Sequence, residues 1–179
     1  VGTIEATDDD GDSITFSISG TDANEFNLVS NTGVLTLIGL ADYESKNSYS
    51  IVITASDGVN SANQNVSVSV NDLNEAPSFT SVSSYSVQEG ITEIGTITTS
   101  DPENNNITYS ISGTDASSIS VNSSTGALTF NSAPDYETKT SYSITATASD
   151  GTNSTNQAIS ISINDLNDNS PTFTSSGSF

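Results

Sequence analysis

The sequence contains no cysteine, histidine, methionine or tryptophan. Without cysteine and histidine, the chain can form neither a disulfide nor a Cys/His zinc site, and it has no thiol nucleophile, catalytic triad or imidazole base. Lys46 and Lys139 are its only basic residues against 22 acidic ones, which gives a formal charge of −20. A chain this acidic offers no surface for nucleic-acid phosphates and no basic patch for a membrane. It also lacks any run of about 18 apolar residues, so no segment is expected to span a bilayer.

The apolar residues alternate with polar ones in several short segments, among them residues 14–18, 49–55 and 66–70. Alternation with a period of two, in β-branched and aromatic residues, is typical of half-buried strands. No segment shows the 3.6-residue period of an amphipathic helix. High net charge with 32% hydrophobic residues is a feature of disordered chains, but the alternation predicts an ordered, all-β protein.

The chain repeats itself with a period of about 93 residues. Residues 1–75 align with residues 94–168 without a gap, and roughly 41 of these 75 pairs are identical. A unit of this length fits one β-sandwich domain, which takes about 100 residues and seven short strands. The expected core of the first repeat is Ile14, Phe16, Ile18, Leu35, Tyr49, Ile51, Ile53 and Val68, with equivalent residues in the second.

The register of the repeat predicts where each domain begins and ends. Repeat one is expected over residues 1–73, a linker over 74–77, repeat two over 78–167, and a linker with the first-strand remnant of a third repeat over 168–179. The strand-like residues 83–87 of repeat two have no counterpart in repeat one, and no signal-peptide core is present, so we expect a piece of a longer protein. Its ends are interpreted either as trimmed or as donor and acceptor of a strand passed between chains.

Most acidic residues fall at the expected ends of strands, at spacings that recur in both repeats. One interpretation is that they are solvated loop carboxylates that keep the protein soluble. The other is a set of calcium ligands, because D-x-E and D-x-D pairs are interleaved with Asn, and calcium prefers six to eight hard oxygen donors. The recurrence of these spacings within loops that otherwise vary favours calcium.

Several of these motifs resemble those of cadherin repeats. The sequence Asp-Leu-Asn-Asp-Asn-Ser-Pro at residues 165–171 is similar to the D-x-N-D-N-x-P linker of that family, and residues 72–77 match it less fully. The family's D-x-E motif matches residues 42–44 and 135–137, and its D-x-D motif matches residues 8–10 and 101–103. The Ser/Thr/Asn-rich background, without Cys or Lys clusters, looks more like bacterial cadherin-like repeats in large surface adhesins than like vertebrate ones. The resemblance implies tandem Greek-key, seven-stranded β-sandwiches of immunoglobulin-like architecture, arranged end to end.

The resemblance also implies calcium ions, two or three of them at the joint between the repeats. That joint would use Asp42, Glu44, Asp72, the Leu73 carbonyl, Asn74, Glu75, the Ala76 carbonyl, Asp101, Glu103 and Asp150. An incomplete joint after repeat two would use Glu89, Asp135, Glu137, Asp165, Asn167, Asp168 and Asn169. An incomplete upstream joint would use Asp8, Asp10 and Asp57. Glu75, Ala76 and Glu103 depart from the family's Asp, Asn and Asp, so the ions are expected to shift there.

The function implied is a calcium-rigidified, extracellular segment of a large cell-surface protein, acting in adhesion or as a stiff extender or filament. Its partners would be neighbouring repeats of the same chain, with homotypic head-to-tail or glycan contacts as further ones. The alternative is a polysaccharide- or protein-binding module in a secreted multidomain protein, and a spacer attached to an enzyme is a third. Paired carboxylates also serve glycosidases, but pairs that recur at domain ends, with few aromatics, predict no enzyme. Residues 8–19 are not an EF-hand, because Ser13 and Ser19 stand where that loop needs Gly and Glu.

Overall fold

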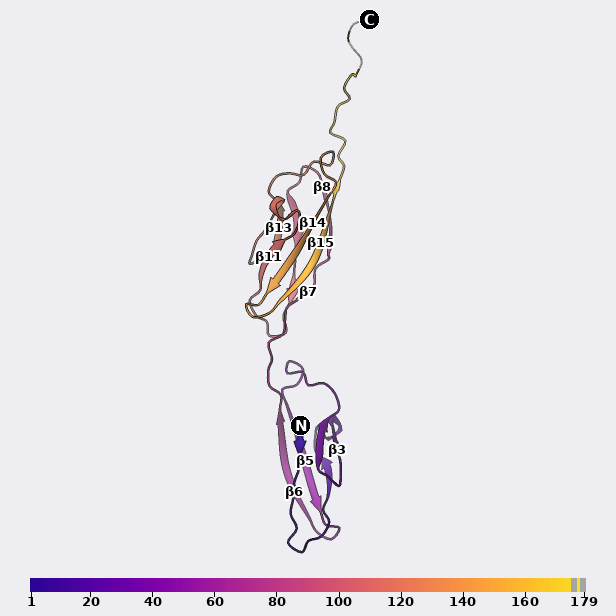
Figure 1. Ribbon diagram of the computed structural model, residues 1–179, viewed down its shortest axis with the longest axis vertical. Coiled ribbons are helices and arrows are strands. Elements are labelled where there is room, and N and C mark those ends of the chain that lie inside the picture. The colour runs from indigo at the N-terminus through magenta and orange to yellow at the C-terminus, as the bar shows by residue number, and fades with distance from the viewer. Residues whose placement is uncertain (175–176, 178–179) are drawn as a thin grey trace. The chain divides into compact units, whose positions relative to one another are not determined.

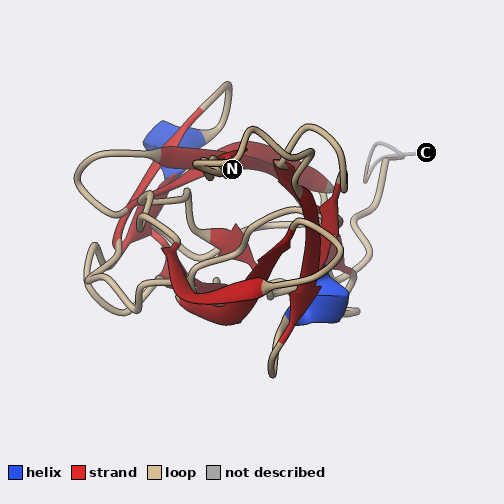
Figure 2. Cartoon of the chain, turned by 90° about the horizontal axis from the view of Figure 1, so that it is seen from below, coloured by secondary structure: helices blue, strands red, loops and turns tan. Residues whose placement is uncertain are grey.

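The computed structural model describes residues 1–174 and 177. The chain divides into two compact units, unit 1 over Val1–Leu73 and unit 2 over Asn74–Phe179 (Figure 1). Among the described residues the only helical elements are two single 3-10 turns, η1 over Ala23–Glu25 and η2 over Ala116–Ser118 (Figure 2). The prediction of an all-β protein is confirmed.

Unit 2 is a sandwich whose larger sheet has the strand order β11-β14-β15-β8 and whose smaller sheet has the order β12-β13-β9, while β10 pairs with β7. All pairs are antiparallel except β8, which runs parallel to β15. Because β7 with β8 and β9 with β10 are two interrupted strands, the nine short strands of its described residues make a seven-stranded sandwich. The strands are β7 Ser78–Phe79, β8 Ser84–Gln88, β9 Glu93–Thr96, β10 Thr99–Ser100, β11 Thr108–Ser112, β12 Ile119–Val121, β13 Ala127–Phe130, β14 Ser141–Ser149 and β15 Ser154–Asn164.

Unit 1 repeats this plan with one sheet in the order β1-β4-β3 and one in the order β2-β5-β6. Within the described part of the chain it holds no counterpart of β8, so β6 pairs only with β5. The strands are β1 Gly2–Thr3, β2 Thr15–Ser19, β3 Phe26–Leu28, β4 Val34–Leu37, β5 Ser48–Ser56 and β6 Ser61–Ser69.

This difference in pairing shows in the cores of the two units. On β15, Ile159 and Ile161 are 1% exposed, whereas the equivalent Val66 and Val68 on β6 are only half-buried. The reason is that β8 extends the sheet beside β15, with Tyr85 opposite Ile161 and partly buried against the core. Removal of apolar surface from water is the main stabilising term in folding, so each unit has a core, and that of unit 2 is more complete.

Most of the expected core residues of unit 1 lie where the alternation placed them. Four are buried, three are half-buried against the cluster, and the prediction for Ile14 is wrong, because it is half-buried outside that cluster. The buried four are Leu35, Tyr49, Ile51 and Ile53, and the half-buried three are Phe16, Ile18 and Val68.

The outward positions of the sheets that contain β5–β6 and β14–β15 carry hydroxyl and amide side chains. On neighbouring strands Thr54 donates to Asn63 at 2.8 Å, and the equivalent Thr147 donates to Asn156 at 2.7 Å. Of the acidic residues, only Glu93 lies within a strand. The negative charge is therefore concentrated in the loops at the ends of the two sandwiches, where any cation site has to be built.

Candidate metal sites at the strand ends

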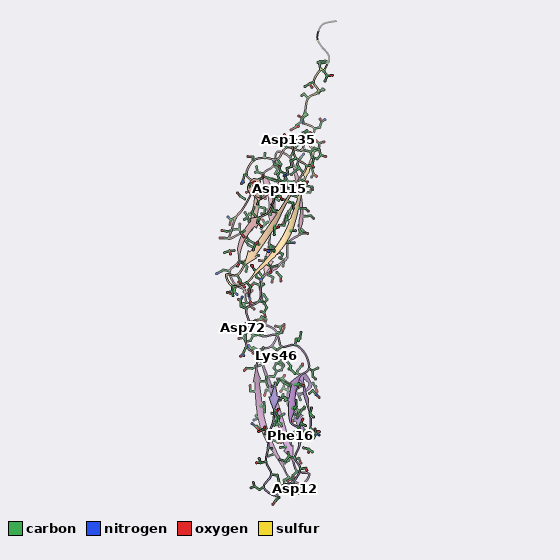
Figure 3. The ribbon with its side chains drawn as sticks, viewed as in Figure 1. Asp12, Phe16, Lys46, Asp72, Asp115 and Asp135 are labelled. Atoms are coloured by element: carbon green, nitrogen blue, oxygen red, sulfur yellow. The ribbon has the colours of Figure 1, made fainter. Side chains whose placement is uncertain are left out.

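Three carboxylates meet at the end of unit 2 from which the chain continues toward its C-terminus. Glu89, Glu137 and Asp168 each offer one oxygen, and these oxygens lie within 4.8 Å of one another. Glu89 follows β8, Glu137 lies in the turn between β13 and β14, and Asp168 follows β15. Figure 3 places Asp135, from the same turn, at this end of the unit. We refer to Glu89, Asp135, Glu137, Asp165 and Asp168 as the C-terminal cluster.

Glu89 is the fixed member of the C-terminal cluster. Its side chain is 5% exposed, and its two oxygens accept backbone N–H groups from two different segments. Oε2 accepts from Tyr136 at 2.7 Å, and Oε1 accepts from Leu166 at 2.6 Å. A buried carboxylate needs such bonds to offset its lost hydration. Glu89 thereby ties the D-x-E turn and the segment after β15 to the end of β8.

The D-x-E turn is organised by its own aspartate. Asp135 Oδ1 accepts the N–H of Glu137 at 3.0 Å, and Oδ2 accepts the hydroxyl of Thr138 at 2.8 Å. The hydrogen bond from the Thr138 hydroxyl is the main reason that the pKa of Asp135 is lowered. A hydrogen bond from its own N–H lowers the pKa of Glu137, but desolvation and the carboxylates of Glu89, Asp135 and Asp165 outweigh it, and the net pKa is raised. Like charges are therefore crowded here, as a divalent cation site requires.

A second group of oxygens gathers at the opposite end of unit 2 around Asn74. Its Nδ2 donates to Asp150 Oδ2 at 2.7 Å, its Oδ1 accepts from Asn105 Nδ2 at 2.7 Å, and its carbonyl accepts from Asn153 Nδ2 at 2.7 Å. Asp150 Oδ1 also accepts the N–H groups of Thr152 and Asn153, each at 2.6 Å. The backbone bond from Asn153 is the main cause that lowers the pKa of Asp150. We refer to Asn74, Glu75, Asp101, Glu103 and Asp150 as the N-terminal cluster.

Two carboxylate oxygens in the N-terminal cluster are buried with no hydrogen-bond partner among the described residues. Asp101 is 8% exposed, and its Oδ1 accepts the N–H of Asn105 at 2.9 Å while Oδ2 has no hydrogen-bond partner. Glu103 Oε2 accepts the N–H of Glu75 at 3.2 Å while Oε1 is buried and unpaired. Desolvation, followed by the neighbouring Glu75 carboxylate, raises the pKa of Glu103. Unpaired buried oxygens are costly, and hard oxygen donors of this kind fit calcium.

Unit 1 carries equivalent groups at its two ends. Asp42 accepts the N–H and hydroxyl of Ser45, at 3.2 and 2.7 Å, so its D-x-E turn matches the one in unit 2. Glu44 and Asp72 offer carboxylate oxygens within 4.8 Å of each other. At the other end, Asp8 and Asp57 line the same hollow.

The remaining predicted ligands are less well placed. Asp10 is outside the hollow that Asp8 and Asp57 line, although its N–H donates to Asp8 Oδ1 at 2.9 Å. Asn167 and Asn169 are exposed after β15, and Asn169 Nδ2 donates to Asp168 Oδ1 at 2.9 Å. The two residues expected to act through their carbonyls are Leu73, which is exposed, and Ala76, which is half-buried.

The motifs gave no indication of two ion pairs beside the D-x-E turns. Lys46 pairs with Asp22 in unit 1, and Lys139 pairs with Asp115 in unit 2. The signal was present in the composition, because the only two basic residues of the chain stand one repeat apart.

A family model described as "Cadherin domain" matches residues 1–71 and 83–164. The chain belongs to the cadherin domain family. Human protocadherin Fat 4 is 33% identical over 184 residues that cover 96% of this chain, and human protocadherin-15 is 31% identical over 187 residues that cover 97% of it. This cadherin chain spans only 4% of the length of Fat 4 and 10% of the length of protocadherin-15.

Solved cadherin structures share its fold. A crystal structure of human protocadherin-24 EC1-2 has a TM-score of 0.68 at 23% identity, and it covers 92% of this chain and 88% of its own. Protocadherin gamma B2 domains 1–5 have a TM-score of 0.63 at 27% identity, with coverage of 87% and 34%. In the described part of the present cadherin chain, no helix has the length and apolar character that a membrane crossing needs.

Proposed function

We propose that this chain is a calcium-rigidified, extracellular repeat segment of a large cell-surface protein that acts in adhesion or as a stiff extender. The observation that carries the proposal is the N-terminal cluster of unit 2. There, Asp101 and Glu103 each keep a buried carboxylate oxygen that has no hydrogen-bond partner in the described part of the chain. A bound divalent cation supplies the positive charge that such oxygens lack.

The residues present fit calcium better than a transition metal, because every donor is a carboxylate, amide or carbonyl oxygen. In the proposed joint between the repeats, Asp42, Glu44, Asp72 and the Leu73 carbonyl would act with the N-terminal cluster and the Ala76 carbonyl. The C-terminal cluster, with Asn167 and Asn169, would hold ions in the same way beside a following repeat, and Asp8, Asp10 and Asp57 beside a preceding one. Without the ions, carboxylates of like charge repel one another at the unit ends, so calcium binding stiffens the chain.

The partners proposed are neighbouring repeats of the same chain. We propose a non-enzymatic role, which membership of the cadherin domain family supports. The Ser/Thr/Asn-rich composition supports a bacterial cadherin-like surface protein as the parent, whereas the relatives described above are animal proteins.

The test is a calcium titration of the full chain by calorimetry, with thermal unfolding and X-ray scattering in calcium and in chelator. We expect micromolar to millimolar affinity, a longer particle, and a stability gain of about 2.7 kcal/mol at a hundredfold excess over Kd. Glu103→Gln should weaken binding. Glu93→Gln removes the same charge from the exposed outside of β9 and serves as its matched control. Identical melting temperature and particle length in calcium and in chelator would rule the proposal out.

A further inference from the structure

The only two basic residues of the chain occupy equivalent places and make equivalent contacts. Lys139 Nζ contacts Asp115 Oδ1 and lies 4.6 Å from the centre of the Tyr142 ring. Lys46 makes the same pair of contacts in unit 1, with Asp22 and with the ring of Tyr49, again at 4.6 Å. The protein has 22 acidic residues, and both of its basic residues stand at the same position of the repeat, directly after the D-x-E turn.

Asp115 is held from a second side. Its side chain is only 12% exposed, and its Oδ2 accepts the N–H of Ser143 at 2.8 Å. Its own N–H donates to the Ser143 carbonyl at 3.3 Å, so the residue is bonded in both directions to β14. The hydrogen bond from Lys139, followed by that from Ser143, lowers the pKa of Asp115. Asp115 is therefore a fixed anchor on the body of the sandwich.

Lys139 joins this anchor to the D-x-E turn. Its backbone N–H donates to the Asp135 carbonyl at 2.9 Å, which closes the turn that carries Glu137. Its side chain reaches Asp115 instead of the carboxylates of the C-terminal cluster. The lysine thus fastens the last residue of the turn to the sandwich without occupying any oxygen proposed to bind calcium.

We propose that Lys139 and Asp115 are positioning residues that hold the D-x-E turn in its ligand-presenting conformation and thereby set the calcium affinity of the C-terminal cluster. Lys46 and Asp22 do the same for Asp42 and Glu44 in unit 1. This inference rests on the proposed calcium function, which it deepens.

If Lys139 acted only through its charge, its removal would change the calcium affinity in the direction opposite to that expected for a positioning residue. A cation near a calcium site weakens binding, so its removal would tighten binding if charge alone mattered. Removal of a group that orients the ligands loosens binding, and the loss of such outer partners costs metal sites about tenfold or more in affinity. Because the charges of Lys139 and Asp115 largely cancel, the positioning effect should dominate. The direction of the change in Lys139→Gln therefore distinguishes the two roles.

The experiment follows the backbone amide signals of Tyr136 and Leu166, which bond to Glu89, during calcium titration of the full chain. In Lys139→Gln and in Asp115→Asn we expect the affinity reported there to fall about tenfold, and in Lys139→Arg to stay within about twofold of wild type, because the cation is retained. Lys46→Gln is the matched control, since it alters unit 1 and should leave these signals of unit 2 unchanged.

Amide hydrogen exchange in chelator gives a readout without calcium. In Lys139→Gln the amides of Thr138 and Lys139 should exchange faster, while the amide of Ile144 in β14 keeps its protection. If wild type binds calcium and Lys139→Gln binds it equally or more tightly, the positioning role is wrong while the proposed function stands. Loss of protection at Ile144 would show a general structural role and also overturn it. If the wild-type signals of Tyr136 and Leu166 do not respond to calcium, the positioning role fails, and the proposed function fails as well only if calorimetry detects no calcium binding to the chain.

Discussion

Asn74 donates a hydrogen bond to Asp150 at 2.7 Å across 76 residues of sequence. Asn74 precedes β7, and Asp150 lies in the turn between β14 and β15, so the bond ties the start of unit 2 to a hairpin near its end. Asn105 and Asn153 complete the arrangement through the side chain and the carbonyl of Asn74. A single amide therefore organises three loops of the N-terminal cluster.

Substitution of this amide should weaken calcium binding. Asn74→Ala removes the side-chain hydrogen bonds to Asp150 and Asn105, together with a local bond to the Glu75 carbonyl. The loops that carry Asp101 and Asp150 are then no longer held together, so we expect the affinity measured by calorimetry to fall about tenfold. Asn106→Ala, an exposed amide in the same loop as Asn105, is the matched control and should bind as wild type. Equal affinities for the two variants would mean that Asn74 does not organise the site.

The response to pH should have a maximum. Glu103 and Glu137 have folded-state pKa values above their ordinary value of 4.5, so the folded state binds these protons more tightly than the unfolded state. Stability in chelator should therefore rise as pH falls through the raised pKa values, and this rise is complete below about pH 4.5. Asp22 and Asp115 have pKa values below their ordinary value of 3.8, mainly through their lysine partners. Their contribution is present above pH 3.8 and is lost as pH falls through the lowered values.

Thermal unfolding in chelator at constant salt, from pH 7 to pH 3, tests this expectation. The double variant Glu103→Gln/Glu137→Gln should flatten the rise in stability above about pH 4.5, because neither side chain titrates any longer. The control is the double variant Glu93→Gln/Glu5→Gln. It removes two exposed carboxylates and therefore has the same net charge as Glu103→Gln/Glu137→Gln. A melting temperature that falls steadily from pH 7 contradicts the assigned directions.

Much of the fold could be predicted from the alternation of apolar and polar residues, because the position of a strand and the face on which each side chain lies are set by the local sequence. Alternation places Ile51 and Ile53 in the core, and the D-x-E spacing places Glu137 beside Glu89 because a short turn leaves few alternatives. The partners of Asn74 and of Lys139 were not predictable, since they come from loops remote in sequence whose approach depends on the packed sandwich. The half-burial of Val68 was also missed, because alternation says which face a residue occupies and not which strand lies beside it.

Because β8 lies beside β15 and β6 has no such neighbour among the described residues, equivalent positions on β15 and β6 differ in burial. Ile161 lies beside β8 and is 1% exposed. Ile161→Ala should therefore lower the free energy of unfolding by about 2–5 kcal/mol, because buried apolar surface is lost and a cavity is left behind. The equivalent Val68 is half-buried, so Val68→Ala should cost about 1 kcal/mol. Urea unfolding followed at amides of Ile144 in unit 2 and Ile51 in unit 1 separates the two. Similar losses in both units would show that β8 adds nothing to the core.

The turn before β13 leaves no room for a side chain at Gly126. Gly126 has φ +72°, and a Cβ there would lie 2.2 Å from the carbonyl oxygen of Ile97, which cannot move aside because it is backbone. Gly151 has φ +98° with no atom within 4 Å of such a Cβ, so it carries the backbone strain without the clash. Gly151→Ala should lower the free energy of unfolding by about 1–2 kcal/mol, because alanine disfavours the left-handed conformation. Gly126→Ala should lower it by at least about twice as much, because the added Cβ also clashes with the Ile97 carbonyl. The clash would push apart the two segments that are joined by the hydrogen bond from the Ile97 N–H to the Gly126 carbonyl at 3.0 Å. Thermal unfolding of both variants in chelator measures the difference. Equal losses of stability would mean that the left-handed backbone conformation accounts for the whole effect and that the contact between Gly126 and Ile97 contributes nothing.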